Sequence, residues 1–156
     1  MAIASRYLYI LDSVMKIDIE EKVEYAQKLH AQGYTCAQSV VMAFCNEIGL
    51  DCKTAERMAF PFGSGVARMR EICGCVSAIA MTGSFIIPYD GVNDKVNKQK
   101  IISWIREAAE EFRKENGDIV CKRLLGIEPG CAVKKKPCNE YVGCAVRIIG
   151  RKINEM

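Results

Sequence analysis

The stretch at residues 71–85 constrains the fold more than any other part of the chain, because its side chains are small or apolar almost all round. A helix of this composition is stable only where other elements cover every face of it. The apolar run that contains it, residues 72–89, includes Gly74, Gly83 and Pro88. A buried helix therefore explains this run better than a membrane span. We therefore expect residues 71–85 to form the central helix of a bundle.

Capping residues and apolar spacing predict further helices on both sides of this stretch. Asp18 and Glu21 form a capping box, and Thr35, Asp51 and Asp94 are N-cap residues before helical patterns. No stretch alternates with period two over the length of a strand. The sequence predicts an all-α, single-domain bundle of about six helices over residues 1–156, with its core at about 19–152. The helices expected around the central one lie at residues 19–32, 36–49, 52–60, 95–116, 119–125 and 138–152.

Composition excludes several classes of function. The net charge is +3 and half of the residues are hydrophobic, which gives no sign of nucleic-acid or membrane binding. Asp12 interrupts the apolar run within residues 1–16 and no cleavage-type site follows, so we expect no signal peptide and a cytoplasmic location. Thiols stay reduced in that compartment, so nine cysteines favour metal binding or redox chemistry over structural disulfides.

The positions of the cysteines are more informative than their number. Four of them are predicted in the first turn of a helix, where unpaired N–H groups and the helix dipole favour the thiolate. These four are Cys36, Cys73, Cys121 and Cys138. The Gly63-Ser64-Gly65 segment is expected to reverse the chain and to bring Cys73 toward the other helix starts.

The remaining five cysteines are expected to have other roles. Cys45 follows Cys36 by nine residues and would face the opposite side of one helix. Cys75 lies two residues after Cys73, about 200° away on a regular helix, so we favour Cys73 for chemistry. We expect Cys45, Cys52 and Cys75 to be mainly packing residues. The sequence leaves Cys131 and Cys144 undecided, and Cys75, Cys131 and Cys144 are kept as substitutes for one of the four.

Three kinds of function remain open on this evidence. Four converging thiolates would bind an iron–sulfur cluster or a tetrahedral zinc ion. Alternatively, a low-pKa Cys73 attacks a substrate disulfide and Cys36 or Cys121 resolves the product. The third hypothesis is a non-enzymatic, metal-stabilised helical interaction module. His30, the one histidine of the sequence, is expected at a helix end and not as a ligand.

Several segments together resemble a known family. They are Gly33-Tyr34-Thr35-Cys36-Ala37-Gln38-Ser39-Val40, residues 62–69, Ile72-Cys73-Gly74, residues 121–126 and Cys138. This set, spread over about residues 19–150, resembles the C_GCAxxG_C_C proteins, which are described as redox-active. The family's central Cys-Gly-Ala-x-x-Gly corresponds to residues 73–78, with Cys75 in place of alanine and Ala78 in place of the closing glycine.

The resemblance implies that the four family cysteines are Cys36, Cys73, Cys121 and Cys138. A related domain accompanies c-type haem segments in split-Soret cytochromes, where an iron–sulfur cluster is implied, so electron transfer is the expected use. This chain has no Cys-x-x-Cys-His segment, so no covalent haem is expected. The basic run at residues 134–136 is expected to be a solvated loop or to steer an acidic redox partner. The sequence leaves open which protein this partner is, whether the chain is an enzyme and whether it forms a homodimer.

Overall fold

The computed structural model describes residues 16–156 and confirms an all-α fold for this part of the chain. The prediction about a signal peptide rests almost wholly on residues 1–15, which lie outside the described range. Within residues 16–156, no helix combines the length and the apolar character needed to cross a membrane. The elements are α2 (Ile19–Ala31), α3 (Cys36–Met42), α4 (Cys45–Ile48), α5 (Cys52–Ala59), the 3-10 helix η1 (Phe60–Phe62), α6 (Gly74–Ile86), α7 (Lys95–Asn116), α8 (Cys121–Leu124) and α9 (Cys138–Asn154).

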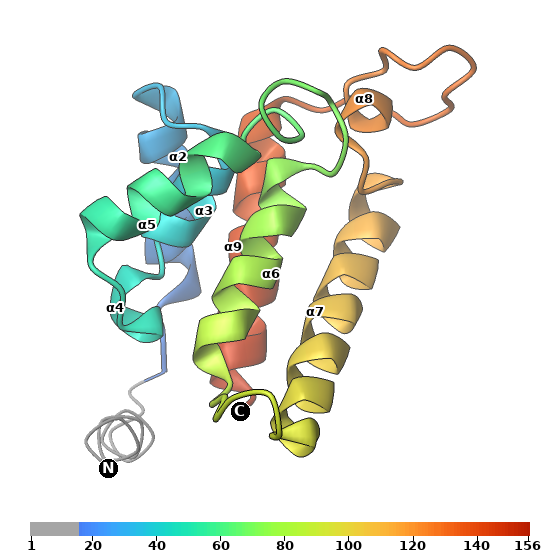
Figure 1. The fold of residues 1–156 in the computed structure, drawn as a ribbon. Coiled ribbons are helices and arrows are strands. Elements are labelled where there is room, and N and C mark those ends of the chain that lie inside the picture. Colours follow the sequence, from blue (N-terminus) through green and yellow to red (C-terminus); the bar gives the residue numbers. More distant parts are fainter. Residues whose placement is uncertain (1–15) are drawn as a thin grey trace.

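Helix α6 lies at the centre of the bundle, as its composition predicts. It contacts α3, α7 and α9, and α2 packs on α9 at the edge (Figure 1). The approach of α6 to α7 is close, because a Cβ atom on Gly83 would lie 2.6 Å from the indole ring of Trp104. Small residues on α6 therefore allow neighbouring helices to approach on several sides.

The helix expected at residues 36–49 is divided into α3 and α4, contrary to the prediction. The ammonium group of Lys22 donates a hydrogen bond to the carbonyl oxygen of Ala43 at 2.9 Å and pairs with Glu47 at 2.7 Å. This bond takes a carbonyl that a continuous helix would use internally. Phe44 leaves the helical conformation, with φ −113° and ψ 16°. A side chain from α2 thus redirects the chain between the two short helices.

Two further helix starts differ from the predicted ones. Helix α6 begins at Gly74, with Cys73 as its N-cap residue in an extended conformation. The carboxylate of Asp118 accepts the N–H groups of Ile119 and Val120, so α8 begins only at Cys121. Ile72 and Val120 then pair in an isolated antiparallel bridge. These short extended segments hold the starts of α6 and α8 together.

The N-terminal ends of α6, α8 and α9 lie at the same end of the bundle, at the top of Figure 1. The chain reaches this end through the loop after η1, through the top of α7 and through the loop before α9. Helix α3, which packs on both α6 and α9, also begins with a cysteine. The cysteine-bearing helix starts are therefore candidates for one common site.

Candidate functional site

Five cysteines interact at this end of the bundle and form what we call the thiol cluster. The Cys75 thiol lies close enough to Cys36 and Cys73 for both of them to raise its pKa. Cys121 is close enough to Cys36 and Cys73 for their charges to raise its pKa, and Cys138 feels the charges of Cys36, Cys73 and Cys121. The structure thus brings the four predicted cysteines near one another and adds Cys75.

Backbone hydrogen bonds fix the relation of Cys73 to Cys121. The Cys73 N–H donates to the Ile119 carbonyl at 2.8 Å, and the Cys121 N–H donates to the Glu71 carbonyl at 2.6 Å. The Lys122 N–H adds a third bond, to the Arg70 carbonyl at 3.0 Å. Two cysteines almost 50 residues apart in the sequence are therefore held by a ladder that needs no cofactor.

A strained loop leads into the cluster. Its non-glycine residues Ser64, Val66, Ala67, Arg68 and Arg70 all have positive φ angles, between 46° and 65°. The left-handed conformation costs a non-glycine residue about 1–2 kcal/mol, and a β-branched residue adopts it very rarely. Such strain is characteristic of segments whose geometry serves a function. We call residues 64–70 the left-handed loop.

The left-handed loop delivers two groups to the thiols. The backbone N–H of Ser64 helps to lower the pKa of Cys36, and the Arg70 guanidinium Nη1 lies 4.0 Å from the Cys121 sulfur. The loop is closed by bonds from the Ala67 N–H to the Pro61 carbonyl and from the Glu71 N–H to the Gly65 carbonyl. The chain reversal expected at residues 63–65 is therefore present, and it also supplies donors.

Cys36 is the acidic thiol of the cluster. The hydrogen bond with Cys75 and the backbone N–H groups of Ser64, Ala37 and Gly74 lower the pKa of Cys36 from 9.0 to about 6, against the opposing effect of burial. Gly74 permits this approach, because a Cβ atom there would lie 2.5 Å from the Cys36 sulfur. Cys36 is therefore a thiolate at neutral pH.

The neighbours of Cys36 favour the protonated form. Hydrogen bonds with Cys36 and Cys73, together with complete burial, raise the pKa of Cys75 well above 9.0. Burial also raises the pKa of Cys121 and of Cys138, and in both cases Arg70 opposes this rise. Cys75 thus remains a thiol that donates its proton toward the Cys36 sulfur.

The angle of about 200° expected between Cys73 and Cys75 applies to a regular helix, and this condition is not met. Cys73 is the N-cap residue, with φ −53° and ψ 132°, and α6 begins only at Gly74. Both thiols can therefore turn to the same side, where Cys73 contributes to the raised pKa of Cys75. The relative direction of the two side chains depends on where the helix begins, and sequence spacing locates helix boundaries poorly.

Cys45 and Cys52 lie apart from the cluster, at the starts of α4 and α5. Cys45 is buried, which fits its predicted packing role, but Cys52 is exposed and does not fit it. The two thiols lie close enough for Cys52 to affect the ionisation of Cys45. Burial first, and then the bond with Cys52, raise the pKa of Cys45 to about 12.

Cys131 and Cys144 do not join the cluster. Cys144 donates to the Glu115 carboxylate at 3.1 Å and accepts from the Asn116 amide at 3.2 Å, and burial raises its pKa to about 12. Cys131 lies in the loop after α8, where its thiol donates to the Arg123 carbonyl at 3.3 Å. The sequence kept both as substitutes, but their partners in the structure are not thiols.

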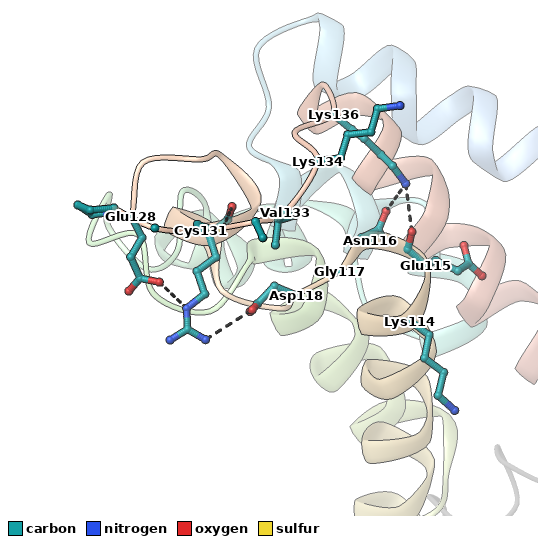
Figure 2. Close-up of a pocket in the computed structure, with 14 residues that line it drawn as sticks. Lys114, Glu115, Asn116, Gly117, Asp118, Glu128, Cys131, Val133, Lys134 and Lys136 are labelled. Atoms are coloured by element: carbon teal, nitrogen blue, oxygen red, sulfur yellow. Dashed lines mark hydrogen bonds and ion pairs between the residues drawn. The ribbon is translucent and has the colours of Figure 1, made fainter.

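Cys131 lines an open pocket of about 710 Å³ between this loop and the end of α7 (Figure 2). Lys136 closes one side of it, with bonds from its ammonium group to the Glu115 carbonyl and the Asn116 side chain. Lys134 is exposed at the rim. The basic run is thus partly solvated, as expected, but its last lysine ties the loop to α7.

No metal site is already assembled in the described part of the chain. Among residues 16–156, no three Cys, His, Asp or Glu side chains are placed to hold one metal ion. The nine cysteines, all within this range, are free thiols. His30 is half-buried in the last turn of α2, where burial lowers its pKa, and it takes no part in the thiol cluster.

Comparison with known proteins supports the interpretation of the cysteines. A family model described as "Putative redox-active protein (C_GCAxxG_C_C)" matches residues 34–152. The match includes the whole thiol cluster and all helices from α3 to α8, with most of α9. Searches of curated proteins and of solved structures give no match. Because the family model covers well over half of the sequence, the chain belongs to the C_GCAxxG_C_C family of redox-active proteins.

Proposed function

We propose that the thiol cluster carries out thiol–disulfide exchange, with Cys36 as the nucleophile and Cys75 as the resolving thiol. The observation that carries this proposal is the proximity of Cys75 to both Cys36 and Cys73, close enough for all three thiols to influence one another's ionisation. It places a second thiol against the sulfur that is to be oxidised. The low pKa of Cys36 supports the same assignment, since the thiolate is the attacking species.

The reaction proceeds in two steps. The Cys36 thiolate attacks one sulfur of a substrate disulfide, forms a mixed disulfide and releases the other substrate sulfur, which takes up a proton. Cys75 then loses its proton to solvent or to a nearby base, attacks the Cys36 sulfur and expels the second substrate thiol. The substrate disulfide is reduced to two thiols, and Cys36 and Cys75 are oxidised to a disulfide. An external dithiol, from a redox partner, restores the reduced protein.

Burial of the two residues suits this order of events. Cys36 is half-buried, so part of its side chain meets solvent, whereas Cys75 has no exposed surface. A substrate therefore reaches Cys36 first and Cys75 acts only after the mixed disulfide has formed. Attack by Cys73 was expected from the sequence, whereas we propose that Cys36 is the attacking thiolate. A reducing compartment such as the cytoplasm would regenerate this site.

The test uses the full-length reduced protein carrying Cys52→Ser, so that this exposed thiol does not contribute, and an aromatic disulfide whose released thiol is coloured. We expect two coloured thiols per protein in the fast phase, and a Cys36–Cys75 link in the digested product. Cys75→Ser should release one thiol and retain the adduct on Cys36, whereas Cys36→Ser should lose the fast phase. Cys144→Ser is the matched control, because that buried cysteine lies outside the cluster. A fast phase that survives in Cys36→Ser would rule out the assignment.

A second candidate function is a metal or iron–sulfur centre held by Cys36, Cys73, Cys121 and Cys138. Its support is the approach of these four thiols together with Arg70, whose positive charge favours the ionised sulfurs. The donor set fits zinc or a cluster chemically, since each is bound by four thiolates. A bound cluster would supply one-electron transfer. Side chains would have to rotate to become ligands, because no three are yet so arranged.

Anaerobic purification distinguishes the two candidates. A metal or iron–sulfur centre predicts stoichiometric zinc or iron, and in the second case visible absorption that dithionite bleaches. Thiol–disulfide exchange predicts a colourless protein in which all nine thiols react under denaturing conditions. If treatment with a chelator leaves the thermal unfolding temperature unchanged, the hypothesis of a metal-stabilised interaction module is also excluded.

A further inference from the structure

We propose that Cys45 and Cys52 form a second redox site, which low-molecular-weight disulfides such as oxidised glutathione convert into an intramolecular disulfide. Neither residue is among the four cysteines to which the family resemblance points, Cys36, Cys73, Cys121 and Cys138. The site lies at the junction of α4 and α5 and stands on its own geometry, so it does not depend on the function of the thiol cluster.

The connection between α4 and α5 places the two thiols against each other. Gly49 ends α4 in the left-handed conformation, with φ 63°, and the chain turns back within two residues. The carboxylate of Asp51 then accepts the N–H groups of Lys53 and Thr54 and starts α5 at Cys52. Cys45 is likewise the first residue of α4, so each thiol sits at the first residue of a short helix. The Leu50 N–H donates to the Cys45 carbonyl at 3.1 Å, so the chain just before Cys52 folds back on Cys45 and brings the Cys52 thiol close enough to raise the pKa of Cys45.

The two cysteines differ in access, which sets the order of the reaction. Cys52 is exposed at the surface, whereas only 6% of the Cys45 surface is accessible. A molecule as large as oxidised glutathione can therefore reach Cys52 and not Cys45. Charges of Asp51 and Glu47 and the nearby Tyr25 surround the pair, and the carboxylates also disfavour ionisation of Cys45. Cys52 is the entry point and Cys45 the internal partner.

Oxidation of the pair takes place in two exchange steps. The Cys52 thiolate attacks oxidised glutathione, forms a mixed disulfide and releases one glutathione, which takes up a proton. The Cys45 thiol gives its proton to solvent, its sulfur attacks the Cys52 sulfur and the second glutathione leaves. Two protein thiols are oxidised to one disulfide and one glutathione disulfide is reduced to two thiols. The high local concentration of Cys45 favours this second step over accumulation of the adduct.

The test treats full-length reduced protein with oxidised glutathione, blocks the remaining thiols and maps disulfides by mass spectrometry without reduction. The unaltered chain should yield a peptide in which Cys45 and Cys52 are joined, lighter by two hydrogen atoms. In Cys45→Ser the reaction should stop at the first step, with a glutathione adduct on Cys52 on the order of tenfold more abundant than in the unaltered chain. In Cys52→Ser, Cys45 should stay free.

Controls keep the outcome independent of folding and of the thiol cluster. Cys36→Ser should leave the Cys45–Cys52 link intact, so loss of exchange at the cluster and loss of this link are separate results. If Cys45→Ser fails to fold, the unaltered chain is titrated in glutathione buffers. The ratio of oxidised to reduced protein then shows whether an internal disulfide forms, because for one internal disulfide this ratio depends on the square of the reduced glutathione concentration. A stable glutathione adduct on Cys52 of the unaltered chain, or a link from Cys52 to another cysteine, would overturn the proposal.

Discussion

The acidity of Cys36 gives the sharpest prediction for the thiol cluster. Its pKa of about 6 should appear as the midpoint of the pH dependence of its alkylation, followed residue by residue by mass spectrometry. Cys45 and Cys144, with pKa values of about 12, should show no plateau below pH 10. A small reagent such as iodoacetamide is suitable, because Cys36 is only half-buried.

The rate at a single pH is a weaker measure than the midpoint. At pH 7, a thiol with a pKa of about 6 is about nine-tenths ionised, against about one-hundredth for an ordinary pKa of 9.0. That is a gain of about 90-fold in thiolate. A thiolate loses nucleophilicity as its pKa falls, with a Brønsted coefficient of about 0.4–0.5, which over three units removes about 16- to 32-fold. The net advantage of Cys36 is only about three- to sixfold.

The decisive perturbation is Cys75→Ala, which removes the largest cause of the low pKa. The Cys36 midpoint should move upward, while Cys75→Ser, whose hydroxyl can still donate, should move it less. Cys144→Ala serves as the control for loss of a buried thiol and should leave the midpoint in place. A midpoint near 9 in the unaltered chain, or one that ignores Cys75→Ala, would refute the hydrogen-bond reasoning.

Four further predictions concern the surroundings of the cluster. Arg70→Met should raise the alkylation midpoint of Cys121, because the guanidinium favours its thiolate; an unchanged midpoint would contradict the contact. Gly74→Ala should lower the free energy of unfolding in urea by about 1–3 kcal/mol, through contact with the Cys36 sulfur. Arg68→Gly should raise the free energy of unfolding by up to about 1 kcal/mol, since it relieves a positive φ at an exposed position. Arg57→Gly, at an exposed position inside α5, should lower the free energy of unfolding by a similar amount. The pKa of Cys36 in the folded protein lies below 9.0, so its thiolate stabilises the fold fully above about pH 9, and this stabilisation is lost as the pH falls toward 6. The difference in unfolding free energy between the unaltered chain and Cys36→Ser should follow the same pH course.

The sequence predicted the helices whose ends carry strong local signals. Asp18, Asp51 and Asp94 cap α2, α5 and α7 with their carboxylates, as expected. The break between α3 and α4 could not be predicted in this way, because it depends on Lys22, which reaches Ala43 from another helix. Sequence patterns indicate hydrogen bonds between residues that are close in the chain, whereas the bond from Lys22 to Ala43 joins two different helices.

The arrangement around the cysteines was harder to predict than their proximity. Cys36, Cys73, Cys121 and Cys138 lie near one another and their role stays a proposal, but nothing in residues 64–70 beyond Gly65 indicates a run of left-handed residues. Val66 and Arg70 adopt positive φ angles only because surrounding contacts impose them. The inclusion of Cys75 likewise followed from the extended backbone at Cys73, which no residue type encodes.

Placement at a helix start does not by itself explain which thiol is acidic. Cys36, Cys121 and Cys138 each occupy the first residue of a helix, yet the pKa falls for Cys36 and rises for the other two. Helix α8 is only four residues long, and for both thiols burial exceeds whatever the helix end contributes. Cys36 differs because hydrogen bonding from Cys75 lowers its pKa most, and backbone N–H groups from the left-handed loop, from α3 and from α6 lower it further. The acidity of this thiol is therefore a product of tertiary hydrogen bonds, which is why mutation of Cys75 or Gly74 should change it more than any alteration within α3.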